Sequence, residues 1–181
     1  MIPANRDNVI KACKGDKNAF SELIQERKSD IYRIAYTYVK NEEEALEILH
    51  DTVYKALISV RKLKNVDCFN AWLSRIIVTC SLDFIKKRKK AIWSELYING
   101  QEEAENIPDE TADYDDVVSS LDIMSAIDRL DLNSKTIIML KYFQDFTLVQ
   151  ISEILACPLG TIKTRLNRAL KTLKVELEES K

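Results

Sequence analysis

The sequence predicts an all-α protein in which an acidic, flexible linker joins two small helical domains, the second being a helix-turn-helix domain. The 181 residues include only three glycines and three prolines, so few tight turns are expected. Apolar residues recur at helical spacing on both sides of residues 91–120. That segment contains nine acids and no Lys or Arg, and such like-charge density with weak periodicity favours an extended chain.

The net charge of −2 hides an uneven distribution of charge. Because the acids of residues 91–120 contribute nine negative charges, the rest of the chain carries +7. A metal-binding acidic loop is the alternative interpretation of this segment, but it lacks the spacing of an EF-hand. His50 is the only histidine, so a zinc site is not expected, and we predict no metal or cofactor.

The cysteines and the apolar runs indicate a soluble cytoplasmic protein. The first residues contain no apolar core of a signal peptide. The longest apolar runs, such as that at 136–140, are far too short to cross a membrane. The four cysteines form no C-x-x-C pair and lie in helical patterns, which predicts reduced, mostly buried thiols: Cys13, Cys68, Cys80 and Cys157.

The first domain is expected to span residues 5–90, and two of its helices can be read from the apolar spacing. One buries a face at i, i+3, i+4 and i+7, made of Ile31, Ile34, Ala35 and Tyr38. The next begins at an N-cap, Asn41, with acids in its first turn and Glu44 as a capping-box partner. Its predicted buried residues are Leu46, Leu49, Val53, Ala56, Leu57 and Val60. Its polar residues are left on the other side: Glu47, His50, Asp51, Tyr54 and Lys55.

A long helix after the break "KLKNVDC" combines aromatic side chains with a basic end. The stretch "FNAWLSRIIVTCSLDFIKKRKK" at 69–90 carries Phe69, Trp72 and Phe84, and it ends in five consecutive cations at 86–90. Clustered cations beside aromatic rings suit single-stranded nucleic acid, where cations track phosphate and rings stack on bases. Cations at a helix C-terminus also complement the helix dipole, so this stretch alone leaves both interpretations open.

The second domain, residues 121–178, contains two short helices joined by a tight break. Thr147 and Gln150 form the pattern of a capping box, and Pro158 excludes a continuous helix through "ACPLG". The following helix is expected to bury Ile162, Leu166, Ala169, Leu170 and Leu173. From Ile154 to Val175 there are five cations and no acid. This pattern is typical of a helix-turn-helix that reads duplex DNA in the major groove, the alternative being an ordinary helical hairpin with a solvated basic face.

In this order, the motifs resemble those of an extracytoplasmic-function (group IV) sigma factor of bacterial RNA polymerase, in the sigma-70 family. The resemblance covers roughly 9–90 and 121–176. The family's polymerase-binding region is similar to "YRIAYTYVKNEEEALEILHDTVYKAL". Its −10 recognition and melting helix is similar to the stretch at 69–90. Its −35-binding domain is similar to "AIDRLDLNSKTIIMLKYFQDFTLVQISEILACPLGTIKTRLNRALKTL". The resemblance implies that the protein directs promoter-specific transcription initiation, typically in a stress response. The implied partners are core RNA polymerase, promoter DNA and an anti-sigma factor, often membrane-bound.

The resemblance also assigns candidate residues. The implied polymerase-binding residues are Glu47, His50, Asp51 and Tyr54. The residues at the place of −10 recognition are Trp72, Arg75, Thr79, Asp83, Lys86, Lys87 and Arg88, with the loop "LKNVDCF" helping to form a base pocket. The −35 candidates are Thr161, Lys163, Thr164, Arg165, Arg168 and Lys171. Trp72, Phe84 and Asp83 can serve as scaffold or as direct contacts, and both possibilities stay open.

Three positions depart from the family pattern. Thr79 stands where Asn is frequent, and a hydroxyl cannot make the bidentate contact of an amide, so the −10 preference is expected to differ. His50 stands where Gln is common. Ala156 stands where the helix-turn-helix often has Gly, and we therefore expect its turn to avoid a positive φ.

Two other classes of protein compete with this interpretation. The chain shows no Ser/His/Asp, Cys/His or phosphate-loop arrangement, so we do not expect an enzyme. A stand-alone helix-turn-helix regulator would bind DNA without core polymerase, which distinguishes it from a sigma factor. We also expect the two domains to fold separately. The linker's contour of about 100 Å would span promoter elements about 35 to 70 Å apart.

Overall fold

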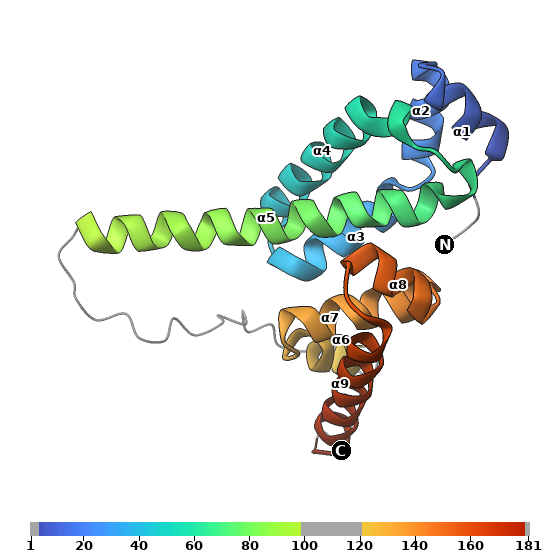
Figure 1. Ribbon diagram of the computed structural model, residues 1–181. Helices are drawn as coiled ribbons and strands as arrows, with labels where there is room; N and C mark the ends of the chain where they lie inside the picture. Colours follow the sequence, from blue (N-terminus) through green and yellow to red (C-terminus); the bar gives the residue numbers. More distant parts are fainter. Residues whose placement is uncertain (1–3, 99–120, 180–181) are drawn as a thin grey trace.

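The computed structural model describes residues 4–98 and 121–179, and every regular element within them is helical (Figure 1). The predicted all-α class with a helix-turn-helix is confirmed. The rest of the acidic linker, 99–120, lies outside the described residues. In chain order the elements are α1 (Arg6–Cys13), α2 (Lys17–Gln25), α3 (Lys28–Val39), α4 (Glu42–Ser59), η1 (Val60–Lys62), η2 (Val66–Cys68), α5 (Phe69–Ile98), α6 (Leu121–Asp128), α7 (Leu132–Ile138), the π-helical turn η3 (Met139–Phe143), α8 (Leu148–Leu155) and α9 (Leu159–Glu179).

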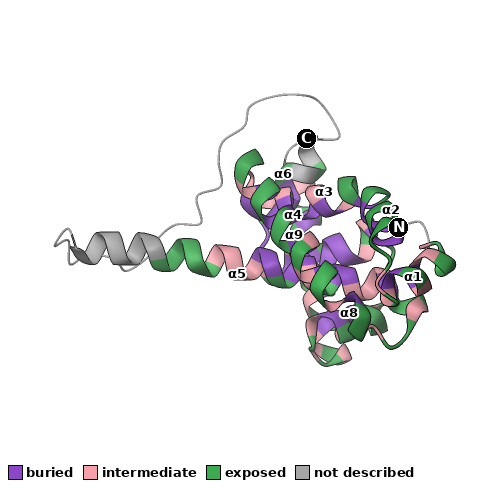
Figure 2. Cartoon of the chain, turned by 90° about the horizontal axis from the view of Figure 1, so that it is seen from above, coloured by how far each residue is buried: buried purple, intermediate pink, exposed green. Residues whose placement is uncertain are grey.

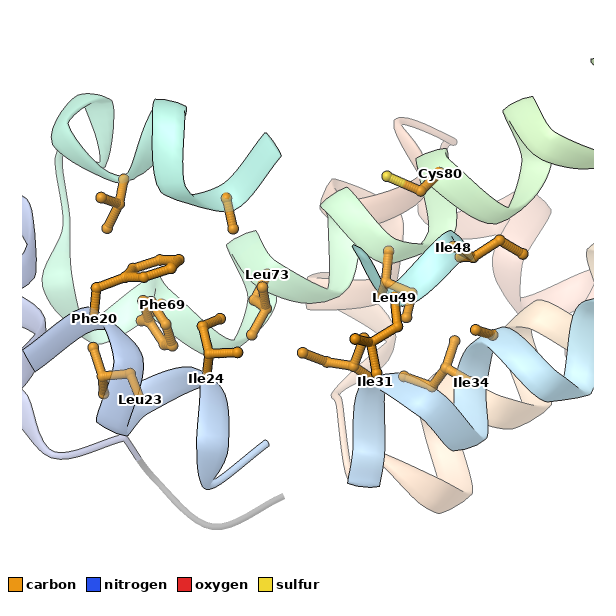
Figure 3. Close-up of a cluster of buried hydrophobic side chains, with 14 of the residues drawn as sticks. Phe20, Leu23, Ile24, Ile31, Ile34, Ile48, Leu49, Phe69, Leu73 and Cys80 are labelled. Carbon is orange, nitrogen blue, oxygen red and sulfur yellow. The ribbon is translucent and has the colours of Figure 1, made fainter. Parts of the chain in front are cut away.

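The core of the N-terminal domain forms where α2, α3 and α4 pack around the first half of α5. Phe69 and Leu73 of α5 are each 1% exposed and belong to one buried cluster with side chains of the other three helices (Figure 3). Burying an aliphatic or aromatic side chain of this size contributes roughly 1.5–3 kcal/mol. The face predicted for α3 is confirmed, because Ile31, Ile34, Ala35 and Tyr38 are all buried.

A buried guanidinium ties the end of α2 to the start of α5. Arg27 is only 2% exposed. Its Nε donates to Asn70 Oδ1 at 2.9 Å, its Nη1 donates to Glu26 Oε2 at 2.8 Å, and its charge lies 5.7 Å from the centre of the Phe69 ring. These contacts compensate for the removal of the charge from water. The sequence pattern gave no sign that this arginine is internal.

The predicted burial of α4 is correct for one side of the helix and wrong for two leucines. Leu49, Ala56 and Val60 are buried, whereas Leu46 and Leu57 are 43% and 42% exposed. The apolar residues of α4 occupy more than one face, and the core covers only part of that circumference.

The start of α4 is also only partly as predicted. The Asn41 side chain caps α4 by accepting from the Glu44 N–H at 3.0 Å. The Glu44 carboxylate does not complete a capping box with it, and instead accepts from Arg88 Nη1 at 2.9 Å.

The helix α5 is longer than the sequence indicated. It continues to Ile98, so the prediction that the helix ends at 90 and the linker begins at 91 is wrong for the first eight residues of that segment. The stretch 91–98 contains neither Gly nor Pro, and Gly100 is the first helix breaker after it. Residues Val66–Lys90 are long and apolar enough to cross a membrane by length and composition alone. Their buried residues form the core described above, which is the arrangement of a central helix in a globular domain.

The C-terminal domain is a bundle of α6 to α9 around Ile137, Ile151 and Ile162, each fully buried. The capping box predicted at the start of α8 is confirmed, since Thr147 and Gln150 exchange both of its hydrogen bonds. On α9 the predicted inward residues are buried except Leu170, which is 37% exposed.

The turn between α8 and α9 does not avoid a positive φ, so that expectation is wrong. Ala156 caps α8 in the left-handed region, at φ 50° and ψ 40°. The turn is held in place by two hydrogen bonds: the Cys157 N–H donates to the Ser152 carbonyl at 3.1 Å, and Ser152 Oγ donates to the Cys157 carbonyl at 2.6 Å. These bonds impose on an alanine a conformation that glycine adopts without strain.

The two domains pack against each other, which the sequence did not predict. In Figure 1, α7 and α8 lie beside α3 and the first half of α5. Val78 of α5 is buried in the apolar cluster of the C-terminal domain, and Leu132 of α7 packs against the cluster of the N-terminal one. The sequence contains no indication of this shared interface, and the separate folding of the two domains stays a prediction.

The four thiols are all free, as predicted, but they are not mostly buried. Cys80 is buried, Cys13 and Cys157 are half-buried, and Cys68 is exposed. Cys68 ends the short helix η2, outside the apolar stripe of α5, and so escapes the core.

Replacing Ala156 with Gly should stabilise the protein. A left-handed alanine costs roughly 1–2 kcal/mol, of which about 0.4–1 kcal/mol is offset by the greater freedom of glycine in the unfolded chain. We expect a gain of up to about 1 kcal/mol, or about 2–4 °C in the melting temperature. Thermal unfolding followed by circular dichroism measures this. The control is Ala169→Gly in the interior of α9, which should lower the melting temperature, and equal losses in both variants would contradict the strained turn.

Candidate functional site

One side of α4 presents a continuous stripe to solvent, and the four predicted polymerase-binding residues lie on it. Glu47, His50, Asp51 and Tyr54 are all exposed. Four large apolar side chains of the same helix are also exposed: Leu46 (43%), Tyr54 (64%), Leu57 (42%) and Ile58 (59%). Figure 2 shows which parts of the helices are exposed, in green, and which are buried, in purple. An acidic and apolar stripe of this kind on one rigid helix is suited to binding another protein.

A hollow of about 400 Å³ lies between α4 and α5, next to this stripe. We call it the α4–α5 hollow, and it is lined by Lys55, Ile58, Ser59, Lys62, Trp72, Arg75, Ile76 and Thr79. Three of the predicted −10 residues, Trp72, Arg75 and Thr79, thus meet in one place. The loop expected to help form a base pocket contributes no lining residue here.

The hollow combines an aromatic wall with polar groups of defined hydrogen-bonding sense. Trp72 is half-buried, and its ring centre lies 5.5 Å from that of Phe69, so it belongs both to the edge of the core and to the wall. Thr79 Oγ1 donates to the Arg75 carbonyl at 2.8 Å, and Ser59 Oγ donates to the Lys55 carbonyl. Because each hydroxyl has only one proton, both can only accept hydrogen bonds from anything bound in the hollow.

The remaining −10 candidates lie further along α5 and are partly paired within the protein. Asp83 Oδ2 lies 3.6 Å from Lys55 Nζ, and Arg88 Nη1 lies 2.9 Å from Glu44 Oε2. Both pairs join α5 to α4. Lys86 and Lys87 are exposed on the same helix. Asp83 therefore has a partner within the protein, Lys55, which also lines the α4–α5 hollow.

The predicted −35 residues lie on one helix, α9, and differ in exposure. Lys163, Thr164, Arg168 and Lys171 are exposed, while Thr161 and Arg165 are half-buried at its N-terminal end. Thr164 Oγ1 donates to the Gly160 carbonyl at 3.0 Å, which fixes its rotamer. The helix begins directly after the turn at Ala156 and packs on α8, so its polar side can enter a groove while its apolar side stays in the bundle.

Arg168 also acts within the domain, toward the N-cap of α7. Burial would by itself raise the pKa of Asp131, but hydrogen bonds from Ser134 and Asn133 and the charge of Arg168 lower it below its ordinary value. The positive charge of Arg168 therefore lies close enough to the start of α7 to act on the Asp131 carboxylate.

The sequence missed the contribution of α4 to the hollow. Lys55 was assigned to the polar side of α4, and Ile58, Ser59 and Lys62 were not singled out at all. Their signal was weak, because each is an ordinary residue near a helix end. What brings them to Trp72 and Arg75 is the packing of α4 on α5. Within the described ranges, no three His, Cys, Asp or Glu side chains are grouped in a way that could hold a metal ion.

Comparison with known families matches both domains. Residues 23–91 match the family described as Sigma-70 region 2, and residues 120–173 match Sigma-70, region 4. The chain belongs to the sigma-70 family of RNA polymerase sigma factors, and it is of the extracytoplasmic-function type. Sigma factors are regulators of transcription rather than enzymes.

Individual relatives are similar over most of their length. The chain is 35% identical over 159 residues to the RNA polymerase sigma factor SigV of Bacillus subtilis, covering 85% of this chain and 88% of SigV. It is 30% identical over 173 residues to the ECF RNA polymerase sigma factor SigW of the same species, covering 92% of both.

The fold is also that of solved sigma factor structures. It matches CnrH, solved in complex with the cytosolic domain of CnrY, with a TM-score of 0.69 and 19% identity over 97% of this chain and 98% of CnrH. It matches RpoE of Bartonella quintana, solved with the anti-sigma factor NepR, with a TM-score of 0.70 and 21% identity over 88% of this chain and 96% of RpoE.

Proposed function

We propose that this sigma factor directs promoter-specific transcription initiation by binding core RNA polymerase, reading the −10 element as a melted strand and reading the −35 element as duplex DNA. The observation that carries the proposal is the α4–α5 hollow beside the exposed α4 stripe, where Trp72, Arg75 and Thr79 meet two lysines: Lys55 of α4 and Lys62 of η1. We assign the −10 and polymerase functions to a domain at 5–90 and the −35 function to one at 121–178.

The chemistry of the hollow fits a nucleotide of a single strand. A base needs an apolar or aromatic wall, which Trp72 and Ile76 supply, while Lys62 and Arg75 can neutralise the phosphates on either side. The hydroxyls of Ser59 and Thr79 can accept hydrogen bonds from an amino group on a base edge. Asp83, Lys86, Lys87 and Arg88 would continue the strand's path along α5.

The α4 stripe fits a protein partner better than DNA. Its acids, Glu47 and Asp51, would repel phosphate, and its exposed leucines would gain from burial against another helix. We infer that the partner is the core polymerase, which would leave the hollow open beside it.

We further propose a cytoplasmic location and regulation by an anti-sigma factor. Support for the anti-sigma factor comes from CnrH and RpoE, which were solved in complexes with CnrY and NepR. Run-off transcription with core polymerase on a promoter library tests the function as a whole. Transcripts that depend on the protein support it, whereas a DNA footprint by the free protein without transcription would favour a stand-alone regulator.

Asp51→Arg should weaken binding to core polymerase by about tenfold or more, because it reverses one charge in the middle of the exposed α4 stripe. The helix content should stay the same, since Asp51 makes no contact in the core. A pull-down of core enzyme without DNA measures the affinity. Glu178→Arg, an equal charge change at the exposed end of α9, is the control, and identical affinities for the two variants would refute the docking surface.

Lys62→Ala should weaken binding of a single-stranded oligonucleotide, whereas Lys64→Ala should not, because only Lys62 lines the α4–α5 hollow. In a Trp93→Phe background Trp72 is the sole tryptophan, so its fluorescence reports occupancy of the hollow. Losing one phosphate contact should lower the salt slope by about 0.7. Equal quenching of the Trp72 fluorescence in both lysine variants would show that the strand does not bind in the hollow.

On α9, Arg165→Ala and Lys171→Ala should differ in kind. If Arg165 contacts guanine in bidentate fashion, its loss costs about 1–3 kcal/mol and relaxes the preference at one −35 position. Lys171 lies further along the helix and should meet phosphate, so its loss should weaken all promoters alike and lower the salt slope by about one unit. A selection of −35 sequences with each variant measures this, and sequence-independent losses for both would restrict α9 to backbone contacts.

A further inference from the structure

One buried charge of the N-terminal domain takes no part in the proposed contacts with DNA or polymerase. Arg27 is only 2% exposed. In addition to its bonds with Glu26 and Asn70, its Nη1 donates to the Leu23 carbonyl at 3.3 Å. Replacing a buried ionic group by an apolar residue of similar volume is often neutral or stabilising. The stability of the fold therefore does not by itself explain a guanidinium at this place.

The position of Arg27 is also unfavourable for a positive charge. Its guanidinium contacts Phe69 and Asn70, the first two residues of α5. The N-terminal end of a helix carries the positive pole of the helix dipole, which repels a nearby cation. The Asn70 amide oxygen and the face of the Phe69 ring offset this repulsion, because both present negative partial charge to the guanidinium. Arg27 thus binds two neighbouring side chains at once and fixes the first turn of α5 against the end of α2.

The contacts of Arg27 lead through Phe69 to the α4–α5 hollow. The guanidinium carbon lies 5.7 Å from the centre of the Phe69 ring, and this centre lies 5.5 Å from that of Trp72, with 40° between the two ring planes. Phe69 is 1% exposed and lies in the buried cluster of the N-terminal domain (Figure 3). Trp72 is half-buried, lines the hollow and makes no hydrogen bond with any described residue. Packing against neighbours such as Phe69 therefore sets the orientation of the indole.

We propose that Arg27 is a positioning residue for the −10 site, which acts through Phe69 on the angle of the Trp72 ring in the α4–α5 hollow. The proposal rests on the function proposed above. Binding groups work best when they are held within roughly 10–20° of the productive geometry by neighbours that are themselves fixed. Arg27 is such a neighbour of the Phe69 ring, because it is bonded to the backbone of Leu23 and to the side chain of Asn70. It does not touch the strand itself.

The effect on the Trp72 ring can be measured in the free protein. In the Trp93→Phe background Trp72 is the sole tryptophan, so time-resolved fluorescence anisotropy reports the motion of its ring. Arg27→Met fills similar space but removes the charge and its hydrogen bonds. We expect the amplitude of the subnanosecond motion to rise about twofold, because Phe69 and the first turn of α5 lose their anchor. Arg33→Met is the matched control, since Arg33 is half-exposed and paired with Asp30, and it should leave this amplitude unchanged.

The consequence for DNA can be measured with the holoenzyme and a probe that carries the −10 element as a single strand. Arg27→Met should weaken probe binding about threefold to tenfold, which is part of the contribution of one stacked base. The salt slope should stay that of the wild type, because no phosphate contact is lost. An abasic nucleotide at the position that stacks on Trp72 should make the two proteins bind equally. In a Trp72→Ala background, Arg27→Met should cause no further loss.

Three results would overturn the proposal. The first is wild-type ring motion in a folded Arg27→Met protein. The second is wild-type probe affinity in a variant whose ring has become mobile, and the third is a loss of affinity that adds to that of Trp72→Ala. If Trp72→Ala itself leaves probe binding unchanged, the proposed function of the hollow fails instead. The anisotropy of the free protein then still decides whether Arg27 positions the ring.

Asn70→Ala tests the same link from the side of α5 and leaves the guanidinium in place. It removes the acceptor for Arg27 Nε and puts a strong helix former into the first turn of α5, so the helix is kept. Ring motion and probe affinity should change in the same direction as in Arg27→Met but by less, because the contact with Phe69 remains. Arg27→Lys keeps the charge without the planar fork and should also be intermediate. Wild-type ring motion in both variants would contradict the link even if Arg27→Met does not fold.

Discussion

The geometry of α5 constrains everything else in this protein, because one helix supplies three different surfaces. With 3.6 residues per turn, its successive side chains divide among three directions. Phe69 and Leu73 enter the N-terminal core, Val78 enters the C-terminal cluster, and Arg75 and Thr79 face the α4–α5 hollow. A substitution on one of these faces therefore affects the other two by shifting or rotating the whole helix. The proposed −10 binding, the stability of the core and the contact between the domains therefore all depend on one helix.

Sequence reasoning succeeded where a local rule fixes the outcome. Apolar spacing identified the buried face of α3, and the Thr147–Gln150 capping box marked the start of α8. It failed where packing partners decide. The exposure of Leu57 and the burial of Arg27 depend on which helices lie opposite, and no residue pattern in α4 or α2 contains that information. Ala156 shows a third case, in which hydrogen bonds across a turn override the preference of its own residue type.

The same distinction holds for the candidate site. Trp72, Arg75 and Thr79 share one stripe of α5, so their convergence follows from helix spacing alone. Lys55 and Lys62 join them only because α4 packs on α5 with its C-terminal end beside the aromatic wall. The domain interface was also invisible to the sequence, since Val78 and Leu132 look like ordinary core residues of their own helices. Periodicity tells which residues are buried but not which domain covers them.

The exposed apolar residues of α4 explain why periodicity misled there. The apolar residues of α4 cover a wider arc than the core does, while Glu47, His50 and Asp51 keep the other side of the helix polar. In the free chain, Leu46 and Leu57 remain in water while Leu49 and Ala56 form the core. The two leucines assigned wrongly to the interior are consistent with the proposed docking surface, because a protein that covered α4 would bury them. An error in predicting the fold thus becomes support for the docking surface, and it does so without reference to the acids on the same helix.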